Sequence, residues 1–141
     1  MNKQGILHKL MLFVILIAGF GLALTLPAWK RYQDQSHAQQ AVVILQQLAQ
    51  QEQAFYAKQG VYTADLASWA DSLPCMPMEK DGESMLRCDG YEVSLEQAQV
   101  LSARSIKYPQ WFHMDIEGTK IHCEYENTSP VGEKLCASVQ L

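Results

Sequence analysis

Positive charge is scarce in the second half of this 141-residue chain. From residue 58 to the C-terminus the sequence has seven basic and thirteen acidic side chains, which gives that part a net charge of −6. A protein surface with this charge repels phosphate backbones, so the composition argues against nucleic-acid binding. The length leaves room for one domain beside a membrane segment.

Motifs that mark catalysis or metal binding are also missing. The sequence has no glycine-rich phosphate loop, no G-x-S-x-G, no Cys-x-x-Cys and no pair of histidines at metal-ligand spacing. His113, His122, Cys123 and Cys136 are the remaining candidates for a metal site, but the histidines are more simply interpreted as strand residues that flank a hairpin turn. Paired cysteines are inert as nucleophiles. We therefore expect no catalytic residue, no metal, no cofactor and no enzymatic activity.

No charged residue occurs between Leu10 and Leu26. Together with its apolar neighbours, this run approaches the ~20 residues that a helix needs to cross hydrocarbon. A cleaved secretory signal is the alternative, but its apolar region usually has only ~7–15 residues and ends at a small-x-small site. The only plausible site here, Leu26-Pro27-Ala28, has a leucine where a small residue is preferred. We expect the segment to be a membrane helix.

The charges beside the apolar run do not decide its orientation. Lys3 and Lys9 on one side are matched by Lys30 and Arg31 on the other. All four cysteines follow the run, and an even number of cysteines in a small domain is typical of an oxidising compartment. We therefore expect the C-terminal domain to lie outside the cytoplasm.

Neither glycine nor proline occurs between Pro27 and Gly60. Apolar residues recur there at spacings of three and four, with Glu52 as the one charged member, and glutamines cover most of the opposite side. The apolar positions are Ala38, Ala41, Val42, Leu45, Leu48, Ala49, Phe55 and Tyr56. Proline kinks a helix without necessarily ending it, and Gly60 suits a helix C-terminus. The pattern predicts one continuous helix of about 50 residues, ~75 Å long.

Shorter patterns follow in the last 80 residues. The expected strands are GYEVSLE (90–96), WFHMDI (111–116) and KIHCEYE (120–126), the last two forming a hairpin. Short helices are expected at 61–74, with Thr63 as N-cap, and at 129–139, with Pro130 near the start, whereas 99–106 is ambiguous between strand and loop. A long helix followed by a small antiparallel sheet is an α+β fold.

The aromatic segment YPQWF (108–112) has two interpretations. It is either an exposed adhesive patch or, as is more usual for aromatic residues, a source of core side chains from Trp111 or Phe112.

Three features together resemble type IV pilins and pseudopilins. The leader MNKQG contains a lysine and ends in glycine, and Pro27-Ala28-Trp29 stands about where the family has Pro-Ala-Tyr. The segment 51–69 is similar to the helix end and following loop of many minor pilins. The resemblance covers about residues 1–70 and is only general in the sheet.

This resemblance implies how the chain is divided and processed. Its parts would be a prepilin leader (1–5), a transmembrane and filament-core helix (6–28), an amphipathic half-helix (29–60) and a disulfide-stabilised head (61–141). A prepilin peptidase would cut after Gly5 and methylate the new amino terminus of Ile6. The mature chain would assemble with other pilin or pseudopilin subunits, through an assembly platform in the bacterial inner membrane, into a type IV pilus or a type II secretion pseudopilus.

Two positions depart from the family pattern. Ile6 stands where the family usually has Phe or Met, and Leu10 occupies the fifth mature position, which is usually glutamate. In the family this glutamate is thought to neutralise the amino terminus of the adjacent subunit. We therefore expect a minor subunit at the tip or in priming. The alternative from another class is a membrane-tethered binding module, an adhesin or competence factor, that does not polymerise.

Four cysteines permit three disulfide connectivities, and the sequence alone does not choose among them. We favour Cys75–Cys88 and Cys123–Cys136 because each pair brackets a polar, turn-rich loop with few apolar residues. The second pair also fits a family habit of attaching the last segment by a disulfide. Each closed loop is near the ~15-residue size for which chain entropy gives ~3 kcal/mol.

Overall fold

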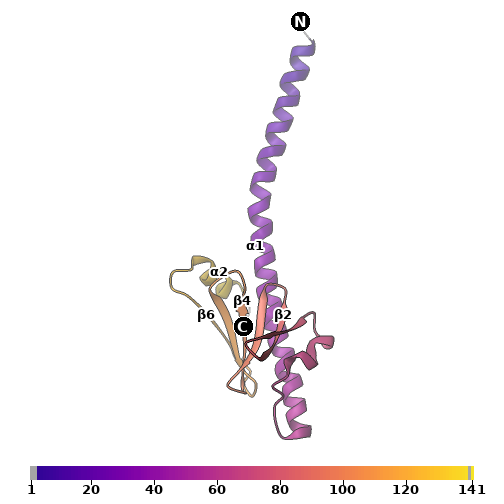
Figure 1. Cartoon of the computed structure of the whole chain (residues 1–141). Coiled ribbons are helices and arrows are strands. Elements are labelled where there is room, and N and C mark those ends of the chain that lie inside the picture. The colour runs from indigo at the N-terminus through magenta and orange to yellow at the C-terminus, as the bar shows by residue number, and fades with distance from the viewer. Residues whose placement is uncertain (1–2, 140) are drawn as a thin grey trace. The chain divides into compact units, whose positions relative to one another are not determined.

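The computed structural model describes residues 3–139 and 141 (Figure 1). Its elements are α1 (Lys3–Gln59), the 3₁₀ helix η1 (Leu66–Ser72), β1 (Met76–Lys80), β2 (Glu83–Cys88), β3 (Tyr91–Glu96), β4 (Val100–Ser105), β5 (Gln110–Asp115), β6 (Ile121–Tyr125) and α2 (Pro130–Ser138). This is the expected α+β fold. The chain divides into two units, Met1–Asp34 and Gln35–Leu141, which are described separately.

The first unit contains the N-terminal part of α1. Every residue from Lys3 to Gln33 is exposed, and Pro27 lies inside the helix without ending it. In the described part of the chain, α1 is the one helix that is long and apolar enough to cross a bilayer, with a mean hydropathy of 2.4 in its most apolar window. This length and composition are compatible with a single-pass membrane anchor.

The second unit contains a six-stranded antiparallel sheet. Its strands are paired in chain order, β1-β2-β3-β4-β5-β6. Asp81 and Gly82 form the tight connection from β1 to β2, and both have positive φ, at 55° and 80°. Two positive φ angles suit the hairpin turn whose twist matches that of the flanking strands. Short connections of this kind produce a simple meander.

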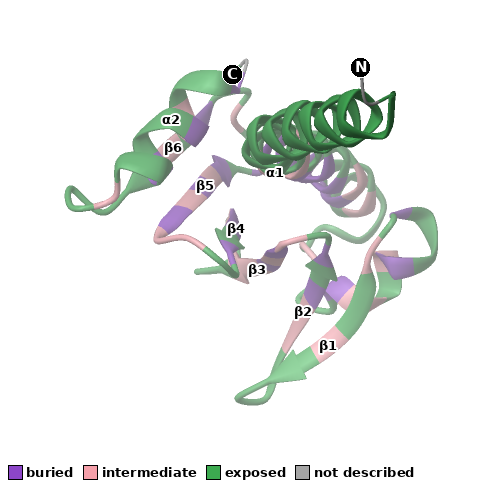
Figure 2. Cartoon of the chain, turned by 90° about the horizontal axis from the view of Figure 1, so that it is seen from above, coloured by how far each residue is buried: buried purple, intermediate pink, exposed green. Residues whose placement is uncertain are grey.

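The core of the second unit lies between α1 and one face of the sheet. Buried residues on α1 include Leu45 and Leu48, and they belong to one cluster with Val93, Ala103 and Phe112 of the sheet. These three strand residues are opposite one another on β3, β4 and β5. Figure 2 shows buried residues on α1 and along the strands. Burying one large apolar side chain contributes about 1.5–3 kcal/mol, so this layer provides most of the stability of the unit.

The apolar stripe of α1 ends earlier than its sequence pattern predicts. Glu52 is the last buried residue of the helix, whereas Phe55 is only half-buried and Tyr56 is 45% exposed. Tyr56 instead stacks on Tyr62 of the following loop, with ring centroids 4.7 Å apart. Gly60, with φ of 73°, follows the helix as expected, and its N–H donates to the Tyr56 carbonyl.

Two further expectations need correction. The segment 61–74 contains a 3₁₀ helix whose N-cap is Asp65 and not Thr63, because the Asp65 carboxylate accepts from the Ala67 N–H. The region 75–88, expected to be a loop, is the β1–β2 hairpin. The ambiguous segment 99–106 contains strand β4, and the expected strands and final helix are present as β3, β5, β6 and α2.

Candidate functional site

The expected processing site lies on the first turns of α1. Gly5 and Ile6 are both helical and exposed, and a side chain on Gly5 would meet nothing within 4 Å. Leu10, at the position where an acid was expected, is 64% exposed. Residues 1 and 2 of the expected leader lie outside the described residues. Cleavage after Gly5 and methylation of Ile6 remain predictions. The exposure of both residues is compatible with access by a peptidase.

Apolar residues predominate on α1 from Ile6 to Leu26, where the polar exceptions are His8, Lys9 and Thr25. The large ones over this segment are between 55% and 75% exposed. Exposed apolar surface is unfavourable by about 25 cal/mol per Å² in water, and a soluble monomer rarely has a continuous patch of this size. This surface therefore requires a cover, either lipid or apolar helices of other chains.

The residue composition of α1 changes abruptly after the apolar segment, from apolar to aromatic and basic residues. Trp29 and Tyr32 have their ring centroids 6.2 Å apart, and the two residues between them are Lys30 and Arg31. Aromatic and basic residues together are typical of the boundary between hydrocarbon and water. The sequence alone identifies this segment by its similarity to Pro-Ala-Tyr and by its charges, and the contact between the two rings is visible only in the structure.

A buried carboxylate joins α1 to the loop that follows it. Glu52 is fully buried, and its oxygens accept hydrogen bonds from the Thr63 N–H and the Trp69 indole N–H, both at 2.9 Å. A buried charge is tolerated only when it has such partners. The sequence showed Glu52 as an exception in an apolar stripe, but not the groups that compensate it.

Both disulfides join the cysteines that the sequence favoured. Cys75 and Cys88 link the two ends of the β1–β2 hairpin, with a Cα–Cα distance of 4.4 Å. Cys123 and Cys136 link β6 to α2, with a Cα–Cα distance of 5.6 Å. All four cysteines are therefore paired in disulfides.

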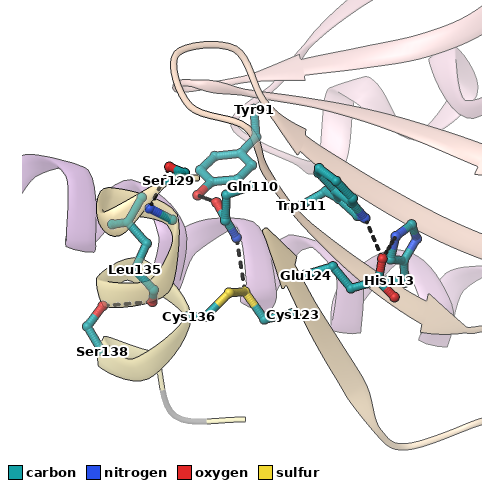
Figure 3. The surroundings of a disulfide bond; sticks show 11 residues. Tyr91, Gln110, Trp111, His113, Cys123, Glu124, Ser129, Leu135, Cys136 and Ser138 are labelled. Atoms are coloured by element: carbon teal, nitrogen blue, oxygen red, sulfur yellow. Dashed lines mark hydrogen bonds and ion pairs between the residues drawn. A yellow bond between two sulfur atoms is a disulfide. The ribbon is translucent and has the colours of Figure 1, made fainter. Parts of the chain in front are cut away.

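A chain of polar contacts leads from the second disulfide into the core. Gln110 is fully buried, and its amide N–H₂ donates to Cys123 Sγ at 3.2 Å (Figure 3). The Tyr91 hydroxyl donates to the Gln110 amide oxygen at 2.6 Å. These groups satisfy one another, so they stabilise the sheet and present nothing to a ligand.

The face of the sheet opposite α1, here called the outer face, carries a shallow groove of about 300 Å³. Trp111 lies in it half-buried, and its indole N–H donates to Glu124 at 2.9 Å; His113 Nε2 lies 3.7 Å from the same carboxylate (Figure 3). Phe112, by contrast, is in the core. Of the two side chains considered for the core, Phe112 lies there and Trp111 lies on the outer face, because successive strand residues point to opposite faces. The adhesive role of YPQWF stays a prediction.

The histidines and cysteines that were weighed as metal ligands do not form a cluster of three. His113 and His122 are opposite each other on β5 and β6, as expected for residues flanking a hairpin turn, while Cys123 and Cys136 are bonded to each other. Among the described residues, no group of three His, Cys, Asp or Glu side chains is placed to hold a metal ion.

The half-buried Tyr62 has a perturbed acidity. Removal of water from its phenol raises the pKa of Tyr62, and so do the hydrogen bond to Glu117 (3.2 Å) and the charge of that carboxylate. The interaction ties the loop after α1 to the β5–β6 connection.

Comparison with protein-family models, curated proteins and solved structures gives no match for this chain.

Proposed function

We propose that this protein is a minor structural subunit, at the tip or in priming, of a type IV pilus or a type II secretion pseudopilus. The observation that carries the proposal is the division of α1 into two kinds of surface. Its segment from Leu10 to Trp29 is uncharged, exposed and in need of a cover, whereas its later segment buries one side against an antiparallel sheet. Lys3 and Gly5 stand before the apolar segment, and a prepilin leader also contains a lysine and ends in glycine.

The location follows from the same features. The chain is held in the bacterial inner membrane by residues 6–28, with the oxidised head outside the cytoplasm, until it enters the filament. A prepilin peptidase removes residues 1–5 and methylates Ile6. Its partners are other pilin or pseudopilin subunits and the assembly platform, and it has no enzymatic activity.

The minor role is inferred from the missing acid. After cleavage, the amino terminus of Ile6 is positive, and Leu10 offers no carboxylate to a neighbouring subunit. Lys9 makes this region still more positive. An unpaired buried charge is unfavourable by several kcal/mol even after relaxation, so a filament shaft of identical copies is disfavoured. A subunit at the end of the filament has a neighbour on just one side, so it avoids this penalty.

The proposal is tested by expressing the chain alone and together with acid-bearing pilins encoded beside it, then measuring its content in sheared filaments. We expect no filaments from the chain alone and a few copies per filament in the mixture. Leu10→Glu should increase its incorporation, while Leu12→Glu, two residues along the same exposed segment, should not. Long filaments made only of the unmodified chain would contradict the minor role.

A membrane-tethered binding module is the second candidate, and the groove on the outer face is the observation that favours it. Trp111 is half-buried there beside charged residues, including Glu92 and Arg104. Several of these groups already have partners within the protein, such as Lys80 with Glu92 at 3.6 Å. A tethered module would keep residues 1–5 when a prepilin peptidase is present, whereas a pilus subunit would lose them.

A further inference from the structure

The uncharged part of α1 has the length of the hydrocarbon core of a bilayer. Twenty residues without charge separate Lys9 from Lys30. At 1.5 Å per residue they span about 30 Å, which is the usual hydrocarbon thickness. If α1 crosses the membrane as proposed above, Trp29 and the residues after it lie at one boundary and Lys9 lies at the other.

The segment 29–32 has the composition that this boundary favours. Trp29 and Tyr32 are 62% and 66% exposed and lie on one side of the helix, with their rings inclined by 33°. Lys30 and Arg31 occupy the remaining circumference, because successive helical residues are about 100° apart. Aromatic rings with a polar edge prefer the headgroup level, and cations there attract lipid phosphates. Asp34 follows one turn later, which leaves residues 30–34 with a net charge of +1.

A hollow on the surface of α1 adjoins the aromatic pair. It measures about 560 Å³ and is lined by Thr25, Leu26, Ala28, Trp29 and Tyr32. Two of these side chains, Thr25 and Ala28, are small, and the two aromatic rings are bulky. The hollow is open and largely apolar, so the upper part of an acyl chain could pack along it with its headgroup at the level of Lys30 and Arg31.

We infer that residues 29–32, here called the collar, bind anionic phospholipid and thereby fix the depth of α1 in the bilayer. The inference rests on the proposed membrane-spanning role of α1 but not on filament assembly. It also places the Gly5–Ile6 bond beyond Lys9, at the opposite membrane surface, where water and a peptidase have access.

The depth is tested with the full chain in phosphatidylcholine vesicles that contain lipids brominated near the carbonyl, midway or near the end of the acyl chain. The part of the Trp fluorescence quenching that is lost in the Trp29→Phe variant is assigned to Trp29. We expect it to be strongest with bromines near the carbonyl. Adding Phe20→Trp to Trp29→Phe places a reporter nine residues, about 14 Å, further along the helix, and its quenching should be strongest near the chain end.

Each outcome of the depth experiment is decisive. Deep or absent quenching of Trp29, with the Phe20→Trp reporter still quenched at depth, would overturn the collar while leaving the membrane span intact. Absence of quenching at both positions would overturn the span as well. A neighbouring protein helix in the hollow would shield Trp29 from all three lipids and would count against the collar.

The charge preference is tested with brominated phosphatidylglycerol and brominated phosphatidylcholine at equal mole fraction. We expect the anionic lipid to quench Trp29 more strongly. A basic side chain near an anionic lipid surface changes binding about fivefold, so Lys30→Gln with Arg31→Gln should remove the preference. Lys58→Gln, in the last turn of α1, is the matched control and should preserve it. Equal quenching by the two lipids in the unmodified chain would refute headgroup binding.

Discussion

Glu52 places a carboxyl group in the buried interface at the end of the apolar stripe of α1. The carboxylate has no exposed surface, and its two oxygens accept from groups on different parts of the following segment, Thr63 and Trp69. These hydrogen bonds fix the direction in which the chain leaves α1. At the scale of single residues, Glu52 is the last buried position of α1 and joins the helix to the loop and the 3₁₀ helix that follow it.

Glu52→Ala should lower the free energy of unfolding by about 2–4 kcal/mol, because two half-buried donors lose their acceptors and a buried side chain is truncated. Glu52→Gln should lower the free energy of unfolding less, because the amide oxygen of glutamine can still accept one of the two hydrogen bonds. Gln50→Ala, at an exposed position of the same helix, should stay within about 0.5 kcal/mol of the unmodified protein. Denaturant unfolding of the full chain in detergent, followed by Trp fluorescence, measures all three, and equal stability of Glu52→Ala and Gln50→Ala would contradict this role.

Tyr62 should make the head less stable at alkaline pH. Its pKa in the folded state is raised, so the unfolded chain loses the phenol proton first as the pH increases. The corresponding stabilisation is complete below the ordinary pKa of 10.0 and is lost as the pH rises through the raised value. Tyr62→Phe should flatten the alkaline decline in unfolding free energy, whereas Tyr125→Phe, on β6, serves as the control. An unchanged pH profile in Tyr62→Phe would contradict the assignment.

Gly90 combines a positive φ of 86° with close approach to α1. A Cβ at this position would lie 3.3 Å from His37 Nδ1, while at Gly82, with φ of 80°, it would meet nothing within 4 Å. Both alanine variants should lose about 1–2 kcal/mol from backbone strain, and Gly90→Ala should lose more. Adding His37→Ala to Gly90→Ala should recover the difference. Equal losses in unfolding free energy at the two glycines would show that the helix contact has no energetic effect.

At the scale of elements, α2 depends on its disulfide. Its nine residues are fewer than the ~12–15 that an isolated helix needs, and its buried residues are limited to Gly132 and Leu135. Cys136 attaches it to β6. The β1–β2 hairpin, in contrast, also has a ladder of backbone hydrogen bonds and contacts η1.

Removal of the two disulfides should therefore have different local effects. Cys123→Ser with Cys136→Ser should lower the unfolding free energy by about 3 kcal/mol and speed amide hydrogen exchange throughout α2. Cys75→Ser with Cys88→Ser should have a similar global effect but leave the exchange of α2 unchanged. Hydrogen exchange followed by mass spectrometry distinguishes them; full protection of α2 without its disulfide would contradict the dependence.

The elements differ in how far their sequences determine them. The long helix and β3, β5, β6 and α2 are predictable because apolar periodicity and turn residues agree locally. The hairpin from Met76 to Cys88 is hard to predict because β1 is short and largely exposed and contains Pro77, although Asp81-Gly82 is a recognisable turn signal. The hydrogen bonds of Glu52 and the contact of Trp111 with Glu124 join positions distant in sequence, and periodicity carries no information about such pairs.

At the scale of the whole molecule, the chain combines a unit that buries almost nothing with one that has a closed core. The head satisfies its buried glutamate and pairs all its cysteines, so its stability does not require a partner. The exposed apolar segment of α1 does require one, and in the proposed function a membrane and then a filament would provide it at successive stages. Removal of the leader is the step that separates a filament subunit from a permanently tethered module.

The intact mass of the protein recovered from cells that contain a prepilin peptidase tests this most directly. Cleavage after Gly5 would leave 136 of the 141 residues, beginning at Ile6 and heavier by one methyl group. The same cells without the peptidase should yield the chain with residues 1–5 still attached. A chain that begins at Met1 in both strains, or at Trp29, would contradict its role as a pilus or pseudopilus subunit.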